Sequence, residues 1–113
     1  MTKEEILGQL EYKQAMKEFL SKSMDFDQAA KALSQNSDAQ KKEKLEQASK
    51  SAWALFCYQM SYLLYLADHI KDDDATAAAE AAKDLRQFVF NHLQKKYEYI
   101  MLITKPQEPY KRQ

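Results

Sequence analysis

The scarcity of helix-breaking residues constrains this chain more than any other feature. Gly8 is the only glycine, and the two prolines, Pro106 and Pro109, both lie among the last eight of the 113 residues. Alanine, leucine, lysine, glutamate and glutamine, which are strong helix formers, dominate the composition. No segment shows the alternating pattern of a strand, and 45% apolar with 30% charged residues is a globular balance. The sequence therefore predicts one all-α domain.

The spacing of apolar residues and the capping signals divide the chain into helical segments. Ser23 or Asp25 is the expected cap of the second helix, which ends near 33–34, and Ser37 is the expected cap of the third. The first, third and fourth predicted helices cover about 3–21, 38–70 and 75–104. The last two are long and are joined by a short turn, which favours antiparallel neighbours. We therefore expect a four-helix bundle-like domain over residues 1–104, built on a long antiparallel hairpin of the third and fourth helices. A polar C-terminal tail over residues 105–113 follows it.

A run of 17 residues, from Ser51 to Ala67, contains no charged side chain. At 3.6 residues per turn, its apolar residues and the nearby Ile70 share one helix face: Trp53, Phe56, Met60, Leu63, Leu64, Ala67 and Ile70. Another face carries four aromatic residues that we call the tyrosine ridge: Tyr58, Tyr62, Tyr65 and His69. The last three follow Tyr58 by four, seven and eleven residues. A single core-facing stripe would leave the tyrosine ridge exposed.

The tyrosine ridge has three interpretations. Its rings mark the boundary of a buried helix, with the hydroxyl groups reaching water. Alternatively they form a homodimer interface, or a dedicated surface for a partner protein or a ligand. A chain this small cannot easily cover both faces of two long helices, which favours a homodimer. The candidate partner-binding or dimer-interface residues are the ridge itself, with Trp53 as an anchor in the core: Trp53, Tyr58, Tyr62, Tyr65 and His69.

The segment RQFVFNH, from Arg86 to His92, places five residues between an arginine and a histidine. This spacing resembles the Arg-x(4–6)-His motif of HEPN domains, small helical bundles of which many are ribonucleases of toxin systems and others are inactive binding modules. The resemblance implies a site in which His92 acts as acid or base while Arg86 holds phosphate charge. Gln87 stands where the family usually has a polar residue. Six residues of helix also place the two side chains about 120° apart.

Several kinds of chemistry have no signal in the sequence. Cys57 is the only cysteine, so an intrachain disulfide is excluded and a reducing compartment, the cytoplasm, fits best. The two histidines have no neighbours at metal-ligand spacing, so we expect neither a metal site nor a cofactor. The uncharged run is shorter than the roughly 20 apolar residues that span a membrane. A net charge of zero, from 17 basic and 17 acidic residues, argues against nucleic acid as a partner.

The sequence thus favours a small, cytoplasmic, non-enzymatic module for protein–protein interaction, which acts with a protein partner, as a homodimer, or both. Adaptor, immunity-type inhibitor and secretion-chaperone roles all fit, and the size and style of the chain are those of bacterial proteins. The alternative is an HEPN-like ribonuclease or nucleotide-binding module that uses Arg86 and His92. The sequence names neither the partner nor the biological process.

Overall fold

The computed structural model describes residues 1–104, so the polar tail predicted over 105–113 lies outside the described residues. Within residues 1–104 the chain forms helices and no strand: α1 (Lys3–Leu7), α2 (Leu10–Ser34), α3 (Ala39–Asp68), α4 (Ala75–Gln94) and α5 (Tyr97–Ile103). The predicted all-α class is confirmed.

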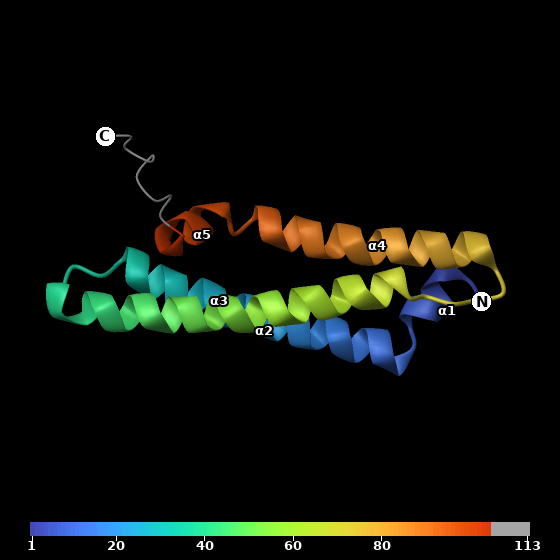
Figure 1. Ribbon diagram of the computed structural model, residues 1–113, viewed down its shortest axis with the longest axis horizontal. Helices are drawn as coiled ribbons and strands as arrows, with labels where there is room; N and C mark the ends of the chain where they lie inside the picture. The colour runs from blue at the N-terminus through green and yellow to red at the C-terminus, as the bar shows by residue number, and fades with distance from the viewer. Residues whose placement is uncertain (105–113) are drawn as a thin grey trace, which may run out of the picture.

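The three long helices α2, α3 and α4 run up and down the long axis of the molecule, each antiparallel to the next (Figure 1). α3 packs against both α2 and α4, and its contact with α2 is the more extensive. α1 lies against α4 at the end that carries the N-terminus, whereas α5 lies against α2 and α3 at the opposite end. A bundle-like domain built on a long antiparallel hairpin is confirmed, although the main hairpin is α2–α3 rather than the third and fourth predicted helices.

The predicted boundary between the first two helices is wrong. The first helix ends just before Gly8, which is its C-cap, and α2 then continues without interruption through residues 21–25, where we expected a break. Glycine costs a helix about 1 kcal/mol relative to alanine, and this weak propensity explains why the chain bends at Gly8. Ser23, a predicted cap, is instead buried inside α2. The length that α2 gains makes it the main partner of α3.

Two other helix boundaries also differ from the prediction. Asp38, rather than Ser37, caps α3, and its carboxylate accepts a hydrogen bond from the Gln40 amide at 2.9 Å. The predicted helix over 75–104 is divided into α4 and α5. Lys96 lies at this division with its side chain turned into the bundle, where only 2% of the residue is exposed.

Aromatic rings from all three long helices meet in the centre of the core. Phe19 of α2 lies 4.9 Å from Phe56 of α3 and 5.4 Å from Phe88 of α4, measured between ring centroids. Phe26, seven residues further along α2, lies 6.5 Å from Phe56 between ring centroids. Full burial of each such ring contributes about 1.5–3 kcal/mol. This shared aromatic centre fixes which face of α3 points inward and hence which face points to solvent.

Candidate interaction surface on α3

The inner and outer faces of α3 differ sharply in exposure. Phe56 and Leu63 on the inner face are fully buried, as their spacing predicted. On the outer face, the side chains of Tyr58, Tyr62 and Tyr65 retain 71%, 41% and 56% exposure. The part of the chain that the structure describes therefore leaves the tyrosine ridge uncovered.

The outer face of α3 carries a seven-residue repeat that extends well beyond the tyrosine ridge. Alternating steps of three and four residues connect nine exposed positions, which we call the α3 seam: Lys41, Lys44, Ala48, Ser51, Leu55, Tyr58, Tyr62, Tyr65 and His69. This spacing is that of the positions through which one helix packs along another in a coiled coil. From Ala48 to Tyr65 no seam position carries a charge. The sequence contains this pattern in full, but only the structure shows that every one of its positions is exposed.

His69, at the end of the seam, is held against its neighbour. Its ring stacks on that of Tyr65 with the centroids 4.2 Å apart, and its Nδ1 atom lies 2.8 Å from the Tyr65 carbonyl oxygen. The two stacked rings thus form one pre-arranged aromatic cluster where α3 ends. Such a pre-arranged surface loses little conformational entropy on binding.

Trp53 belongs to the inner side of α3. Its half-buried ring lies 5.1 Å from that of Phe26 and 5.5 Å from that of Phe56. Phe26 in turn contacts Tyr99 of α5 edge-on, at 6.5 Å. Trp53 thus links α3 to α2 near the position of α5, while the tyrosine ridge lies on the opposite side of the same helix.

Arg86 and His92 do not converge on one site. The Arg86 guanidinium forms an exposed ion pair with Asp68 of α3. His92 is half-buried on another side of α4, where its ring meets Phe19 edge-on at 5.5 Å and its Nδ1 lies 2.8 Å from the Phe88 carbonyl oxygen. These two environments agree with the separation of about 120° that the helix spacing predicts. A phosphate bound by Arg86 would therefore lie away from the His92 ring.

A shallow apolar groove of about 570 Å³ runs between α3 and α4, and its lining includes no residue of the α3 seam. Met60 and Leu64 form its α3 side, and the 53%-exposed Phe90 is its most prominent α4 residue. Lys83 and Arg86 add positive charge to its lining. The sequence alone did not predict the groove, because its two walls come from different helices.

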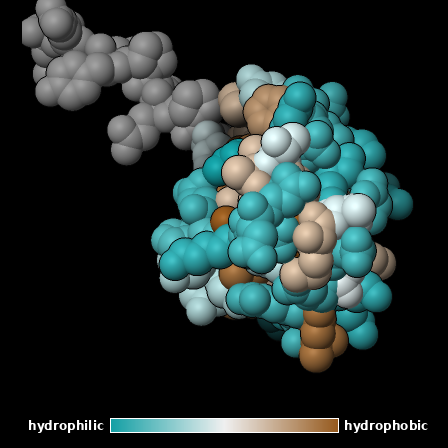
Figure 2. Space-filling view, turned by 90° about the vertical axis from the view of Figure 1, so that its right-hand side faces the viewer, coloured by the Kyte–Doolittle hydropathy of each residue, from teal (hydrophilic) through white to brown (hydrophobic). Residues whose placement is uncertain are grey.

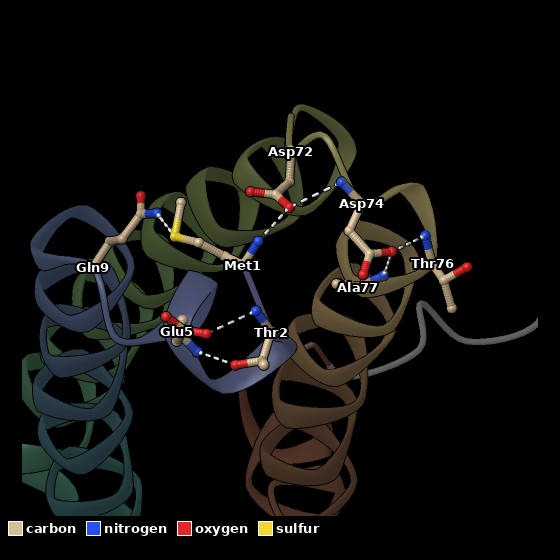
Figure 3. Close-up of polar contacts among 8 residues, drawn as sticks. All are labelled: Met1, Thr2, Glu5, Gln9, Asp72, Asp74, Thr76 and Ala77. Atoms are coloured by element: carbon tan, nitrogen blue, oxygen red, sulfur yellow. Dashed lines mark hydrogen bonds and ion pairs between the residues drawn. The ribbon is translucent and has the colours of Figure 1, made fainter.

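The end of the bundle that carries the N-terminus has a different character. Hydrophilic residues cover most of it in Figure 2, and apolar residues are scattered. Figure 3 shows the bonds that organise this end. The Met1 amine bonds the Asp72 carboxylate at 3.0 Å, while Asp74 caps α4 by accepting from the amides of Thr76 and Ala77.

Two pKa shifts follow from the Met1–Asp72 pair. The hydrogen bond that the Met1 amine donates to the Asp72 carboxylate raises the pKa of the amine. The hydrogen bond from that amine, together with one from the Asp74 amide, lowers the pKa of the Asp72 carboxyl. The carboxylate thus joins the start of the chain to the α3–α4 connection.

The remaining candidate groups are the single cysteine and the side chains that could bind a metal. Cys57 is a free, half-buried thiol, and burial raises its pKa, which disfavours the nucleophilic thiolate. In residues 1–104, no three His, Cys, Asp or Glu side chains come together as metal ligands would. No helix in the same range combines the length and apolar character needed to cross a bilayer.

No protein-family model, curated protein sequence or solved structure matches this chain.

Proposed function

We propose that this protein is a non-enzymatic helical module for protein–protein interaction, and that the α3 seam binds a helix of its partner. One observation carries the proposal. A continuous seven-residue repeat along α3 is exposed at every position and presents three tyrosines, Tyr58, Tyr62 and Tyr65. Tyrosine is enriched at protein interfaces because it offers a large, rigid contact area together with a hydroxyl group.

The geometry of the seam favours a helix over other kinds of partner. A seven-residue repeat keeps its side chains in register with a second helix over many turns. Binding to a flat or irregular partner surface would not need such a repeat. The seam spans residues 41–69, so it is about 40 Å long at about 1.5 Å per residue. The seam positions from Ala48 to Tyr65 carry no charge, which avoids the cost of removing charges from water at the centre of an interface.

Adaptor, immunity-type inhibitor and secretion-chaperone roles are all roles for such a module, and a cytoplasmic setting suits its single free cysteine. These roles differ in the partner and not in the surface used. The first experiment therefore identifies the surface.

Photo-crosslinking tests the proposal directly. A photoreactive phenylalanine analogue replaces Tyr62 in the seam, and in a second variant it replaces Tyr97, an equally aromatic and 65%-exposed residue of α5. In cells that express the protein, we expect a discrete covalent adduct from position 62 and a much weaker one from position 97. Equal yields from the two positions would contradict a dedicated surface on α3.

A further inference from the structure

Charge is distributed unequally along α3 and the connection that follows it. Residues 41–50 hold four lysines and two glutamates, a net charge of +2. Residues 68–74 hold four aspartates and one lysine, a net charge of −3, although Asp68 already pairs with Arg86 and Asp72 with the Met1 amine. The uncharged run lies between these two segments. The seam therefore has a basic end and an acidic end on either side of a neutral centre.

The seam side chains also change in size along α3, from small near the basic end to large near the acidic end. The half nearer the basic end presents small side chains at Ala48 and Ser51, and Ala54 beside them is small and exposed as well. The half nearer the acidic end presents the large rings of Tyr62 and Tyr65. A helix packed against this surface therefore needs bulk opposite the small half and small residues opposite the large half.

The seam itself, turned end for end, meets both requirements. We infer that the partner helix is α3 of a second copy of this chain, packed antiparallel about a two-fold axis near residues 56 and 57. This inference rests on the proposed function of the seam and adds the identity and direction of the partner. A two-fold interface uses the same patch on both copies, so a patch that complements itself in reverse meets its symmetry.

The register follows from the heptad positions. In an antiparallel coiled coil, heptad position a of one helix faces position d of the other. In the seam, Ala48, Leu55 and Tyr62 are a positions, and Ser51, Tyr58 and Tyr65 are d positions. Tyr62 then packs on Ser51 of the second copy, Tyr65 on Ala48 of the second copy, and Leu55 on Tyr58 of the second copy. In this register residues 41–45 of each copy, which hold Lys41, Lys42 and Lys44, lie opposite residues 68–72 of the other, which hold Asp68 and Asp72. Large residues meet small ones, and each charge cluster meets its opposite.

A parallel arrangement lacks both kinds of complementarity. It would bring the +2 segments of the two copies together and likewise the −3 segments. It would also stack Tyr62 on the second copy's identical ring while leaving the small half underpacked. Like charges placed opposite each other oppose association.

A charge-reversal variant tests the arrangement without disturbing the fold. Lys41→Glu with Lys44→Glu changes two exposed residues near the start of α3, where acidic side chains are favourable to the helix dipole. Sedimentation equilibrium should give a dimer for the wild-type chain. For the variant it should give a dimer dissociation constant raised by about tenfold at low salt, equivalent to about 1.4 kcal/mol. The effect should shrink at high salt.

The matched control is Lys13→Glu with Lys17→Glu, the same charge change at exposed positions of α2, and its dissociation constant should stay close to that of the wild type. A wild-type chain that remains monomeric at every concentration measured overturns the inference. So does a dimer that the reversal at residues 41 and 44 leaves unchanged, which is the result expected of parallel copies.

Chemical crosslinking reports the direction independently. In a Cys57→Ser background, Ala54→Cys and Ser61→Cys place single thiols at exposed positions beside the seam. Antiparallel packing brings residue 54 of one copy close to residue 61 of the other. A mixture of the two variants treated with a short bis-maleimide should yield mainly the mixed 54–61 product, identified by mass spectrometry. A predominance of same-residue products contradicts the antiparallel arrangement.

Failure of this inference can be distinguished from failure of the proposed function. If the purified chain is monomeric while position 62 still gives a strong photo-adduct with another protein, the second copy is excluded and the seam remains a binding surface. If position 62 gives no more adduct than position 97, the seam itself is not the binding surface.

Discussion

Lys96, between α4 and α5, extends its ammonium group into the bundle and bonds the Asp27 carboxylate of α2 at 2.7 Å. The same ammonium donates to the Ser23 carbonyl at 3.2 Å and lies 5.3 Å from the centre of the Phe56 ring. A buried charge needs such partners because its removal from water is costly. This cluster fixes the C-terminal end of the bundle to α2.

Removal of the Asp27 carboxylate should destabilise the fold more than removal of the Lys96 charge. Asp27→Ala leaves the ammonium buried with one partner fewer, and we expect the free energy of unfolding to fall by roughly 1–3 kcal/mol. Lys96→Met keeps the length of the side chain and removes the charge, so it should cost less. Urea unfolding measures both, with Lys95→Met, at the exposed neighbouring lysine, as a control expected to change little. An Asp27→Ala variant as stable as the wild type would show that the ion pair contributes nothing.

The two faces of α3 should respond to mutation in opposite ways. Phe56→Ala removes a fully buried ring, and we expect the free energy of unfolding to fall by about 3–5 kcal/mol. Tyr58→Ser with Tyr65→Ser changes exposed side chains, so the stability of the monomer should change by about 0.5 kcal/mol or less for each substitution. Association through the seam should nevertheless be lost.

Thermal unfolding together with sedimentation separates these effects, and Tyr97→Ser is the matched control outside the seam. A large loss of monomer stability in the double tyrosine variant would indicate that those rings pack within their own chain.

The Met1–Asp72 ion pair predicts a pH window. Because the pKa of Asp72 is lowered in the folded state, its carboxylate stabilises the fold fully above the ordinary pKa of 3.8. This stabilisation is lost as the pH falls through the folded-state pKa. Because the pKa of the Met1 amine is raised in the folded state, the charged amine stabilises the fold fully below the ordinary pKa of 8.0. This stabilisation is lost as the pH rises through the folded-state pKa. The Met1–Asp72 pair therefore stabilises the fold at pH values between the folded-state pKa of Asp72 and that of the Met1 amine.

NMR titration of the Asp72 carboxyl checks this window. We expect an apparent pKa for Asp72 below the ordinary aspartate value of 3.8, and we expect acetylation of the amine to raise it. An Asp72 titration that acetylation leaves unchanged would exclude the pair in solution.

The separation of Arg86 from His92 predicts that neither supports RNA cleavage. Arg86→Ala removes one exposed ion pair with Asp68, which should cost about 1 kcal/mol or less. His92→Ala removes a half-buried ring that packs on Phe19 and should therefore cost more stability than Arg86→Ala. Incubation with RNA compares the wild-type protein with both variants. Cleavage by the wild type that either substitution abolishes would restore the HEPN-like alternative.

The periodicity of α3 predicted the inner face correctly because burial follows the 3.6-residue repeat, as Phe56 and Leu63 show. The helix ends were harder to predict. Ser23 has the chemistry of a cap, yet its neighbours do not interrupt a helix and the core covers it. Asp38 and Ser37 are both good caps, and the sequence alone does not distinguish them.

Other features depend on contacts between distant residues. Nothing local to Lys96 shows that its partners lie more than 65 positions earlier in the chain. The groove between α3 and α4 likewise needs both helices in place before Phe90 and Met60 can be seen as neighbours. The positions of the seam were readable from the sequence, but their exposure was not, because it depends on which face of α3 the aromatic core covers.

The ratio of photo-crosslinking yields at positions 62 and 97 tests the central claim most directly, since both residues are exposed tyrosines and only one lies in the α3 seam. We predict a discrete adduct from position 62 and little from position 97. Equal yields from the two positions, or none from position 62, would mean that the exposed repeat along α3 is not a binding surface.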